Sequence, residues 1–422
     1  MLDRKQPPSF SPIQDFKLIK AKSYQLDNQA KIHVVNAGRQ PVINMQIYFK
    51  AGRWHEHIKG TSFLTAKMIP EGSLLHSSKQ ISQKFDGLGA FLEVSSGYDL
   101  VGVEVYCLNQ HLEKLLPLVN ELITTATFPE VEFKGLKDRF IQQLSINLQK
   151  NNYVASAKLK ETIFGKDHPY GYATDIELME KVQHAEVKSL FDEKISGCPF
   201  EIFLSGQVEE AHIKQVNKEL GKIPIIKPLG KPSLPEDPLT DEFNYYEEKP
   251  ESVQTSIRIG KKLFPKKHED ALKFEVLNEV LGGYFGSRLM KNIREEKGLT
   301  YGIHSNMVFL HNGSYFVIGT DVKKDKKDIA LEEIYKEINI LCTQAVPEEE
   351  LNLVKNYLAG SHIKSINTPF SISEHNKTLY FSKLPENYYD NYIKKINDVS
   401  AEDIMEMANK YLKSDLYEIL VG

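Results

Sequence analysis

Few side chains of this 422-residue sequence stand at spacings that could support catalysis. Neither a Gly-x-Ser-x-Gly nucleophile turn nor a phosphate-binding loop is present, and the glycines at 282–286 lack the lysine that such a loop needs. His55-Glu56-His57 could offer metal ligands, but histidines at i and i+2 have no obvious further ligands in the sequence. We therefore predict close helix packing or a turn for the glycines, and a solvated polar turn for the histidines.

Arg294 and Tyr301 are a second candidate pair, separated by Gly298-Leu299. A guanidinium and a phenol can both donate hydrogen bonds to a carbonyl oxygen and stabilise negative charge that develops on it. The same residues also fit a charged helix end followed by a half-buried tyrosine in a strand. From the residues alone, both interpretations stay open.

The bulk composition excludes several classes of partner. The net charge is −4, and the 53 lysines and arginines are scattered, so we predict no nucleic-acid partner. No segment approaches the roughly 20 apolar residues that cross a bilayer, which predicts no membrane span.

The cysteine usage bears on the cellular compartment. Cys107, Cys198 and Cys342 are odd in number and widely separated, which predicts buried free thiols and favours a reducing compartment. The N-terminus has charge and proline but no apolar core like that of a secretory signal. We therefore expect a cytoplasmic protein.

The elements that must position these residues occur twice along the chain. Pro129 and Pro347, each followed by acidic residues that suit a helix start, are 218 positions apart (347 − 129). Gly206 and Gly422, each closing an apolar strand, are 216 apart (422 − 206). Strand alternation and helix stripes also recur, at Ile43, Met45, Ile47 and Phe49 against Val253, Thr255, Ile257 and Ile259, and at Leu115, Leu118, Val119, Leu122 and Ile123 against Ile334, Ile338 and Leu341.

This repetition predicts an α+β fold with two homologous domains from an internal duplication. Each domain should be a mostly antiparallel mixed sheet packed with helices, because hairpin signals such as Asn312-Gly313 interrupt the alternation of strands and helices. Five prolines crowd the boundary. We therefore place the first domain at 1–221, a proline-rich linker at 222–240 and the second domain at 241–422.

Two segments resemble one known family. The run from Leu281 to Tyr301 is similar to a second-domain signature in which a helix ending in Arg is followed by Gly-Leu and a Tyr on the next strand. His168-Pro-Tyr-Gly171 is similar to a first-domain segment of the same family. With the closing strand and glycine of each half, the chain resembles the pitrilysin and mitochondrial processing peptidase-like zinc peptidases over nearly its whole length.

The resemblance implies that this chain has lost the family's zinc site. Active members carry His-x-x-Glu-His on a helix and a distant Glu as third ligand. The corresponding positions here hold Phe63, Ala66, Lys67 and Gln143. Phe63 has no donor atom, Ala66 cannot be a base and Lys67 repels a cation. We expect no metal in this chain.

The resemblance also implies what remains. In the family, the matching Arg and Tyr donate hydrogen bonds to the substrate backbone, which assigns Arg294 and Tyr301 to peptide binding. We expect the non-catalytic subunit of a heterodimeric zinc metalloendopeptidase, inactive as a single chain, whose homologous partner bears the zinc and cleaves peptides in a closed chamber. A proteolytically inactive scaffold and a peptide-binding homodimer stay open as alternatives.

Overall fold

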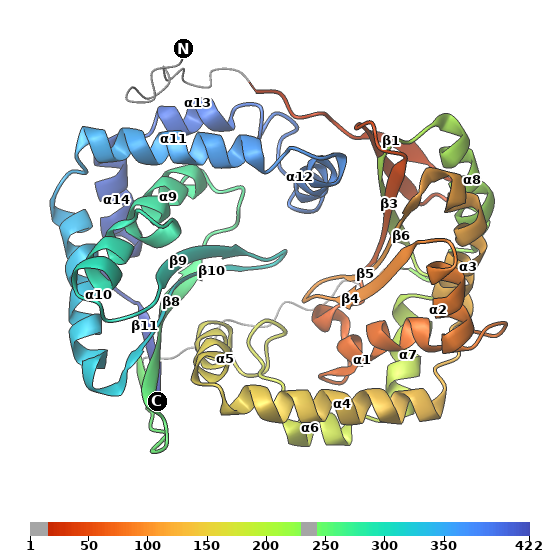
Figure 1. The fold of residues 1–422 in the computed structure, drawn as a ribbon, viewed down its shortest axis with the longest axis horizontal. Helices are drawn as coiled ribbons and strands as arrows, with labels where there is room; N and C mark the ends of the chain where they lie inside the picture. The colour runs from red at the N-terminus through yellow and green to blue at the C-terminus, as the bar shows by residue number, and fades with distance from the viewer. Residues whose placement is uncertain (1–15, 229–242) are drawn as a thin grey trace, which may run out of the picture.

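The computed structural model describes residues 16–228 and 243–422, which form two halves, each built on one sheet (Figure 1). The elements of the first half are β1 (Lys22–Gln25), β2 (Lys31–Asn36), β3 (Val42–Phe49), η1 (Arg53–His55), α1 (Thr61–Met68), η2 (Ile69–Glu71), α2 (Ser78–Asp86), β4 (Phe91–Ser96), β5 (Val101–Leu108), η3 (Asn109–His111), α3 (Leu112–Thr125), α4 (Glu130–Gln149), α5 (Asn151–Phe164), α6 (Ile176–Lys181), α7 (His184–Lys194), β6 (Phe200–Gly206) and α8 (Glu210–Leu220). Those of the second half are β7 (Asn244–Glu247), β8 (Gln254–Leu263), α9 (Ala271–Asn278), η4 (Glu279–Gly283), η5 (Met290–Glu296), β9 (Ile303–Phe309), β10 (Ser314–Lys323), η6 (Lys324–Lys326), α10 (Lys327–Thr343), α11 (Glu348–Lys364), α12 (Pro369–Phe381), α13 (Tyr392–Asn397), α14 (Ala401–Tyr411) and β11 (Tyr417–Val421).

The two sheets share one topology. The first has the order β1-β2-β6-β3-β5-β4, and the second has the order β7-β11-β8-β10-β9. If β1 is left out, the two sheets match strand for strand. Each sheet has one parallel pair, β2 with β6 in the first and β7 with β11 in the second, and its other pairs are antiparallel. The predicted fold class, a duplicated α+β unit with mixed sheets, is confirmed.

The hydrophobic pattern of β3 explains how each sheet faces its own helices. Ile43, Met45, Ile47 and Phe49 are at most 1% exposed and belong to one apolar core with residues of α1 and α3. Since side chains alternate along a strand, the residues between them point to the opposite face. That second face carries polar side chains, Asn44 and Gln46 among them.

A helix from the other half covers this second face in each sheet. Helix α12 packs on β6 and β2, and α5 packs on β8 and β11; α12 lies next to the first sheet and α5 next to the second (Figure 1). The two helices begin 218 positions apart (369 − 151). The duplicated halves are therefore joined by an exchange of equivalent helices.

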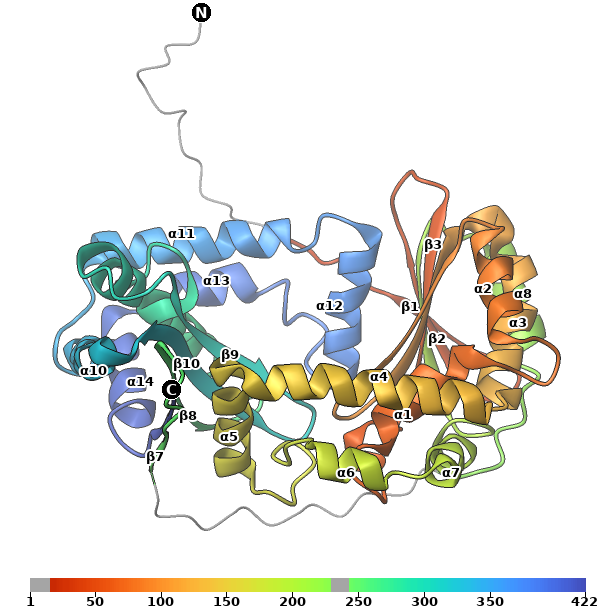
Figure 2. The same cartoon turned by 60° about the horizontal axis from the view of Figure 1, so that its bottom comes forward.

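The two contacts differ in chemistry. A small apolar core joins α5 to the second sheet, with Leu159, Ile163 and Phe164 of the helix packed against Ile419 and Val421 of β11. The α12 contact is more polar, because Lys377 Nζ donates to the Tyr48 hydroxyl at 2.7 Å and the Tyr380 hydroxyl donates to Glu201 at 2.6 Å. Helix α4 crosses from the first half toward the second and leads directly into α5 (Figure 2).

The first described residues also join the two halves. The Leu18 amide donates to the Asp390 carboxylate at 2.9 Å, and the Ala21 amide donates to Asn376 Oδ1 at 2.8 Å. Residues 229–242, which hold most of the predicted linker at 222–240, lie outside the described residues. The domain boundaries at 221 and 241 stay a prediction. In the described part of the chain, no helix is long and apolar enough to cross a membrane.

A tertiary contact shifts the hairpin turn between β9 and β10 by one residue. The hairpin is present, but Leu310 and Gly313 are the hydrogen-bonded pair, so the turn is centred on His311 and Asn312 rather than on Asn312-Gly313. The Asn312 amide donates to the Tyr170 hydroxyl of the first half at 3.0 Å, and its side chain donates to Asp99 at 3.3 Å. These contacts favour the observed register.

We predict that the α5 contact contributes strongly to stability. Leu159→Ala should lower the free energy of unfolding by about 2–5 kcal/mol, because Leu159 is 1% exposed and its loss leaves a cavity between the halves. Urea denaturation followed by circular dichroism measures this change. Ile146→Ala, at a half-exposed position of α4, is the control and should cost less than about 1 kcal/mol. Equal costs for the two variants would contradict the packing described here.

Candidate functional site

Helix α1 carries the three positions where the resemblance places zinc ligands and their base. It begins after Gly60, whose φ of 90° lies in the left-handed region that glycine tolerates. The Glu56 carboxylate accepts from the Gly60 amide at 3.1 Å and from the Ser62 amide at 2.6 Å, and the Tyr172 hydroxyl donates to it at 2.7 Å. A carboxylate here satisfies amides that the first helical turn leaves free. Glu56 is therefore a helix cap, and the prediction of a solvated turn is wrong for this residue.

The two histidines beside Glu56 do not converge. His57 Nε2 lies 3.1 Å from Glu193 in a largely exposed pair. Burial, with Lys194 and Lys50 nearby, lowers the pKa of His55 to about 4, so its ring is neutral at pH 7. Within the described ranges, no group of three or more His, Cys, Asp or Glu side chains could hold a metal ion.

Apolar side chains fill the seam between α1 and α4. The Phe63 ring lies 4.4 Å from the Phe140 ring of α4, centroid to centroid. Ala66 is fully buried. Carbon atoms therefore stand at the positions where the resemblance places one imidazole and the catalytic carboxylate.

Lys67 makes a specific contact with the edge of the first sheet. Its ammonium donates to the Val94 carbonyl of β4 at 3.0 Å. Val94 faces Val103 of β5, and Gly97 and Leu100 form a hydrogen-bonded pair further along the same ladder. Because hydrogen-bonded and non-hydrogen-bonded pairs alternate along an antiparallel ladder, Val94 and Val103 form a non-hydrogen-bonded pair. The Val94 carbonyl consequently points away from β5, and Lys67 satisfies an acceptor on the free edge of β4.

Gln143 lies on α4, one turn beyond Phe140, and is exposed. Its amide donates to Asn147 Oδ1 at 3.3 Å, along the same helix. A neutral amide oxygen, a phenyl ring, a methyl group and an ammonium do not fit zinc, which takes thiolate, imidazole or carboxylate ligands. We derive no metal chemistry for this chain.

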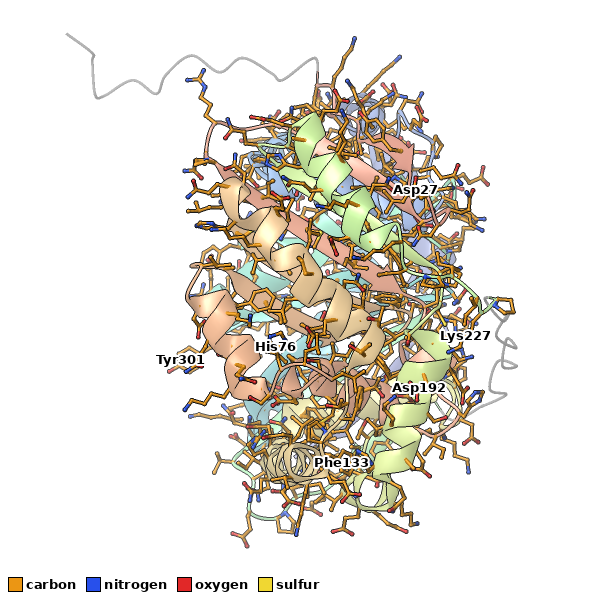
Figure 3. The ribbon with its side chains drawn as sticks, turned by 90° about the vertical axis from the view of Figure 1, so that its right-hand side faces the viewer. Asp27, His76, Phe133, Asp192, Lys227 and Tyr301 are labelled. Carbon is orange, nitrogen blue, oxygen red and sulfur yellow. The ribbon has the colours of Figure 1, made fainter. Side chains whose placement is uncertain are left out.

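Arg294 and Tyr301 lie in the second half, on either side of a tight turn. Gly298, with a φ of 60°, allows the chain to reverse, and the Leu299 amide bonds back to the Ile293 carbonyl at 2.9 Å. Tyr301 was predicted on the next strand, but it precedes β9 and its side chain is 97% exposed. Figure 3 shows it projecting at one edge of the molecule.

The Arg294 guanidinium stacks over the Phe285 ring, 4.6 Å from guanidinium carbon to ring centroid. Phe285 is itself 63% exposed, and Arg294 keeps a third of its side chain accessible. The ion pair recorded for Arg294 is a long one, 3.9 Å to the adjacent Glu295. Stacking on an aromatic ring orients a guanidinium and leaves its N–H groups able to donate.

Partly buried polar contacts hold the segment of Arg288 and η5 against α10 and α11. Arg288 makes a two-pronged ion pair with Glu350 of α11 at 2.9 and 2.8 Å. Asn292 donates to Glu333 at 2.9 Å and to Glu337 at 2.7 Å, both on α10. Phe285, Arg288 and Asn292 were not singled out from the sequence. The spacing of Arg288 and Asn292, polar residues at i and i+4, could have indicated a polar helix face. No pattern in the sequence indicated that Phe285 is exposed.

The space between the halves offers backbone groups to an extended chain. Strands β4 and β9 each end their sheet, so each has one unpaired edge. A cavity of about 460 Å³ lies between the halves, with Ser95 of β4, Phe309 of β9, Tyr98 and Lys377 among its walls. Unpaired strand edges are sites where peptides add as a further strand.

The three cysteines are buried and free, as predicted. His168 lies in a turn, where its Nδ1 accepts from the Tyr170 amide at 2.9 Å. Neither observation adds a catalytic group to the site.

Known proteins similar to this chain cover nearly its whole length. Residues 31–172 match the family model described as "Insulinase (Peptidase family M16)", and residues 181–358 match the one described as "Peptidase M16 inactive domain". The chain is 22% identical over 412 residues to the "Uncharacterized zinc protease YmxG" of Bacillus subtilis, spanning 95% of this chain and 98% of that protein. It is 22% identical over 403 residues to the "Non-peptidase homolog YmxG" of Helicobacter pylori, spanning 93% and 91%. A crystal structure of a peptidase M16 inactive domain from Pseudomonas fluorescens has a TM-score of 0.82 at 24% identity, covering 95% of this chain and 97% of that one.

We predict that the purified chain retains less than about 0.1 zinc ion per molecule, since the four positions offer no suitable ligand set. Elemental analysis after dialysis measures this ratio. The variant Phe63→His/Ala66→Glu/Lys67→His/Gln143→Glu is the positive control and should bind zinc at least about tenfold tighter than the wild type. A wild-type chain that holds one zinc ion, removable by a chelator with loss of stability, would contradict the prediction.

Proposed function

We propose that this chain, which belongs to the peptidase M16 family, is the non-catalytic subunit of a heterodimeric zinc metalloendopeptidase. It lacks the His-x-x-Glu-His motif of the active members. In the assembly, a homologous subunit carries the zinc and cleaves peptides, and this chain contributes Arg294 and Tyr301 to peptide binding.

One observation carries the proposal. Phe63, Ala66 and Lys67, at the positions that the resemblance assigns to zinc and its base, are engaged in packing or in a bond to β4. Arg294 and Tyr301 are present and accessible. A scaffold has no need of an exposed guanidinium and phenol at this spacing, whereas a subunit that completes a partner's site does.

The chemistry of the pair suits a peptide backbone. A guanidinium and a phenol donate hydrogen bonds to a carbonyl oxygen, and such donors act most strongly when they are positioned before the reaction begins. The stacking on Phe285, the Arg288–Glu350 ion pair just before η5 and the hydrogen bond from Asn292 to Glu333 support that positioning of Arg294. The partner's zinc would supply the activated water. The edges of β4 and β9 could align an extended substrate between the halves.

A peptide-binding homodimer or inactive scaffold is the second candidate. The Helicobacter pylori relative bears the name non-peptidase homolog, and this chain likewise lacks the motif. The free strand edges support peptide binding without cleavage as well. The three buried free thiols support a reducing, cytoplasmic setting for either function.

We predict that Arg294→Ala lowers kcat/KM of the assembled pair by about 10²–10³, because it removes a donor aimed at the scissile carbonyl. Tyr301→Phe removes only a hydroxyl and should cost about tenfold or more. Cleavage of a fluorogenic peptide by the zinc-bearing homologue with each variant measures both effects.

Lys291→Ala is the matched control, since Lys291 is an exposed cation one turn earlier on η5. It should leave kcat/KM within about twofold of the wild type. The affinity between the subunits should be the same for all variants. Unchanged kinetics with Arg294→Ala would overturn the proposed role.

A further inference from the structure

A cavity of about 360 Å³ lies within the second half and is lined by residues of α9, η4, α11, α12 and α13. The helices α9, α11 and α13 pack against one another (Figure 1). The lining combines carboxylate, imidazole and phenol groups, among them Glu275, Glu279, His362, Tyr388, Tyr389 and Tyr392. Neither Arg294 nor Tyr301 lines this cavity, so it offers chemistry that the proposed peptide-binding pair does not use.

The cavity occupies the place in the second half that corresponds to the α1–α4 seam of the first. Helix α9 follows β8 as α1 follows β3, and α11 begins one residue after Pro347 as α4 begins one residue after Pro129. In each half the two helices pack together. Phe63 and Phe140 fill the seam of the first half, whereas the second half has polar side chains around a cavity.

The Glu279 carboxylate faces this cavity without a partner. Glu279 is 8% exposed, and its carboxylate makes no hydrogen bond or ion pair with the residues that the structure describes. Burial and the nearby charge of Glu275 raise the pKa of Glu279 to about 7. A buried carboxylate is costly unless a cation or hydrogen-bond donors satisfy it, so this side chain favours a positively charged occupant.

Two other charged groups of the cavity do not satisfy Glu279. The Glu275 carboxylate lies one helical turn earlier and accepts from the Tyr392 hydroxyl at 2.7 Å. Lys266 also lines the cavity, but its ammonium lies over the Tyr389 ring, 5.9 Å from the centroid. Within the described ranges, Lys266 forms no ion pair with either carboxylate, although its charge lowers the pKa of Glu275 in part.

His362 adds a buried acceptor. It is 7% exposed, and its Nε2 is buried and has no hydrogen-bond partner among the described residues. Burial, with His375 and Lys266 nearby, lowers the pKa of His362 to about 4, so the ring is neutral at pH 7. A hydrogen bond to the Tyr389 backbone favours the proton on Nδ1, which leaves Nε2 as an acceptor.

These groups match the donors of a primary ammonium. An ammonium has three N–H donors, and Glu275, Glu279 and His362 Nε2 offer acceptors in one cavity. The tyrosine rings in the walls also attract a cation. A metal ion fits less well, because no group of three His, Cys, Asp or Glu side chains in the described part of the chain could hold one. Acceptors lie roughly 2.7–3.2 Å from an ammonium nitrogen, against about 2.0–2.2 Å for nitrogen and oxygen ligands of zinc, so a wider arrangement suits an ammonium.

We propose that this cavity binds a small organic molecule through its primary ammonium group, with Glu279, Glu275 and His362 as acceptors. Lys266 also lines the larger cavity between the halves, so the two spaces adjoin. The ligand contacts α9, α11 and α13 together with α12, the helix that packs on the first sheet. Binding therefore stabilises the folded chain, and it requires no zinc-bearing partner.

The test titrates the full wild-type chain with butylammonium chloride in amine-free phosphate buffer, by isothermal titration calorimetry. Butan-1-ol has the same carbon chain without the charge, and tetramethylammonium has the charge without N–H donors. We expect saturable binding of butylammonium, with a dissociation constant at least about tenfold lower than those of the other two compounds. Butylammonium should also raise the melting temperature, since it binds only the folded chain.

Glu279→Gln keeps the shape of the side chain and removes its charge. The variant should bind butylammonium at least about tenfold more weakly. It should fold, because it loses an unpaired buried charge, and thermal unfolding without ligand checks this. Glu332→Gln is the matched control, since Glu332 is an exposed carboxylate on α10 of the same half. It should leave the dissociation constant within about twofold.

Four results would overturn the ammonium site. Equal affinities for butylammonium and butan-1-ol would show that the charge is not recognised. An affinity that a folded Glu279→Gln variant leaves unchanged would place the ligand elsewhere. Tetramethylammonium bound as tightly as butylammonium would assign the cation to the tyrosine rings alone. Binding of zinc without binding of butylammonium would assign the cavity to a metal ion.

Discussion

The reciprocal packing of α5 and α12 is the constraint on which the rest of the molecule depends. Each helix covers the sheet of the other half, so neither half can move without uncovering apolar or polar groups of its partner. The contacts of Asn312 with Tyr170 and Asp99 join the halves at a third place. Together they set the separation of the free edges of β4 and β9, and hence the space in which an extended peptide could lie.

The changes at the degenerate site form a consistent set. Phe63 pairs with Phe140 across the α1–α4 seam, and Lys67 bonds to the edge of β4 through Val94. A cation and an aromatic pair thus link α1 to its neighbours at the positions where the resemblance places the metal site. Arg294, in the other half, is positioned by different contacts. The loss of zinc ligands therefore need not disturb the residue that we assign to peptide binding.

Much of the fold could be predicted because its signals are local and repeated. Pro129 and Pro347 mark two helix starts, and α4 and α11 begin one residue after each. Local signals fail where distant segments meet. Glu56 caps α1 with help from a tyrosine 116 positions away, and the exposure of Tyr301 depends on where neighbouring elements end. Which positions replace the zinc ligands stays a prediction from the family pattern, and that pattern gave no sign of the bond of Lys67 to β4.

The most direct test of the central claim is a titration of the zinc-bearing homologue with this chain, followed by the rate of peptide cleavage. Our account predicts little activity for either protein alone and a rate that rises until one chain is present per homologue. The activity of the mixture should be lost on chelation. A homologue that is fully active alone, with a rate unaffected by this chain, would contradict the account.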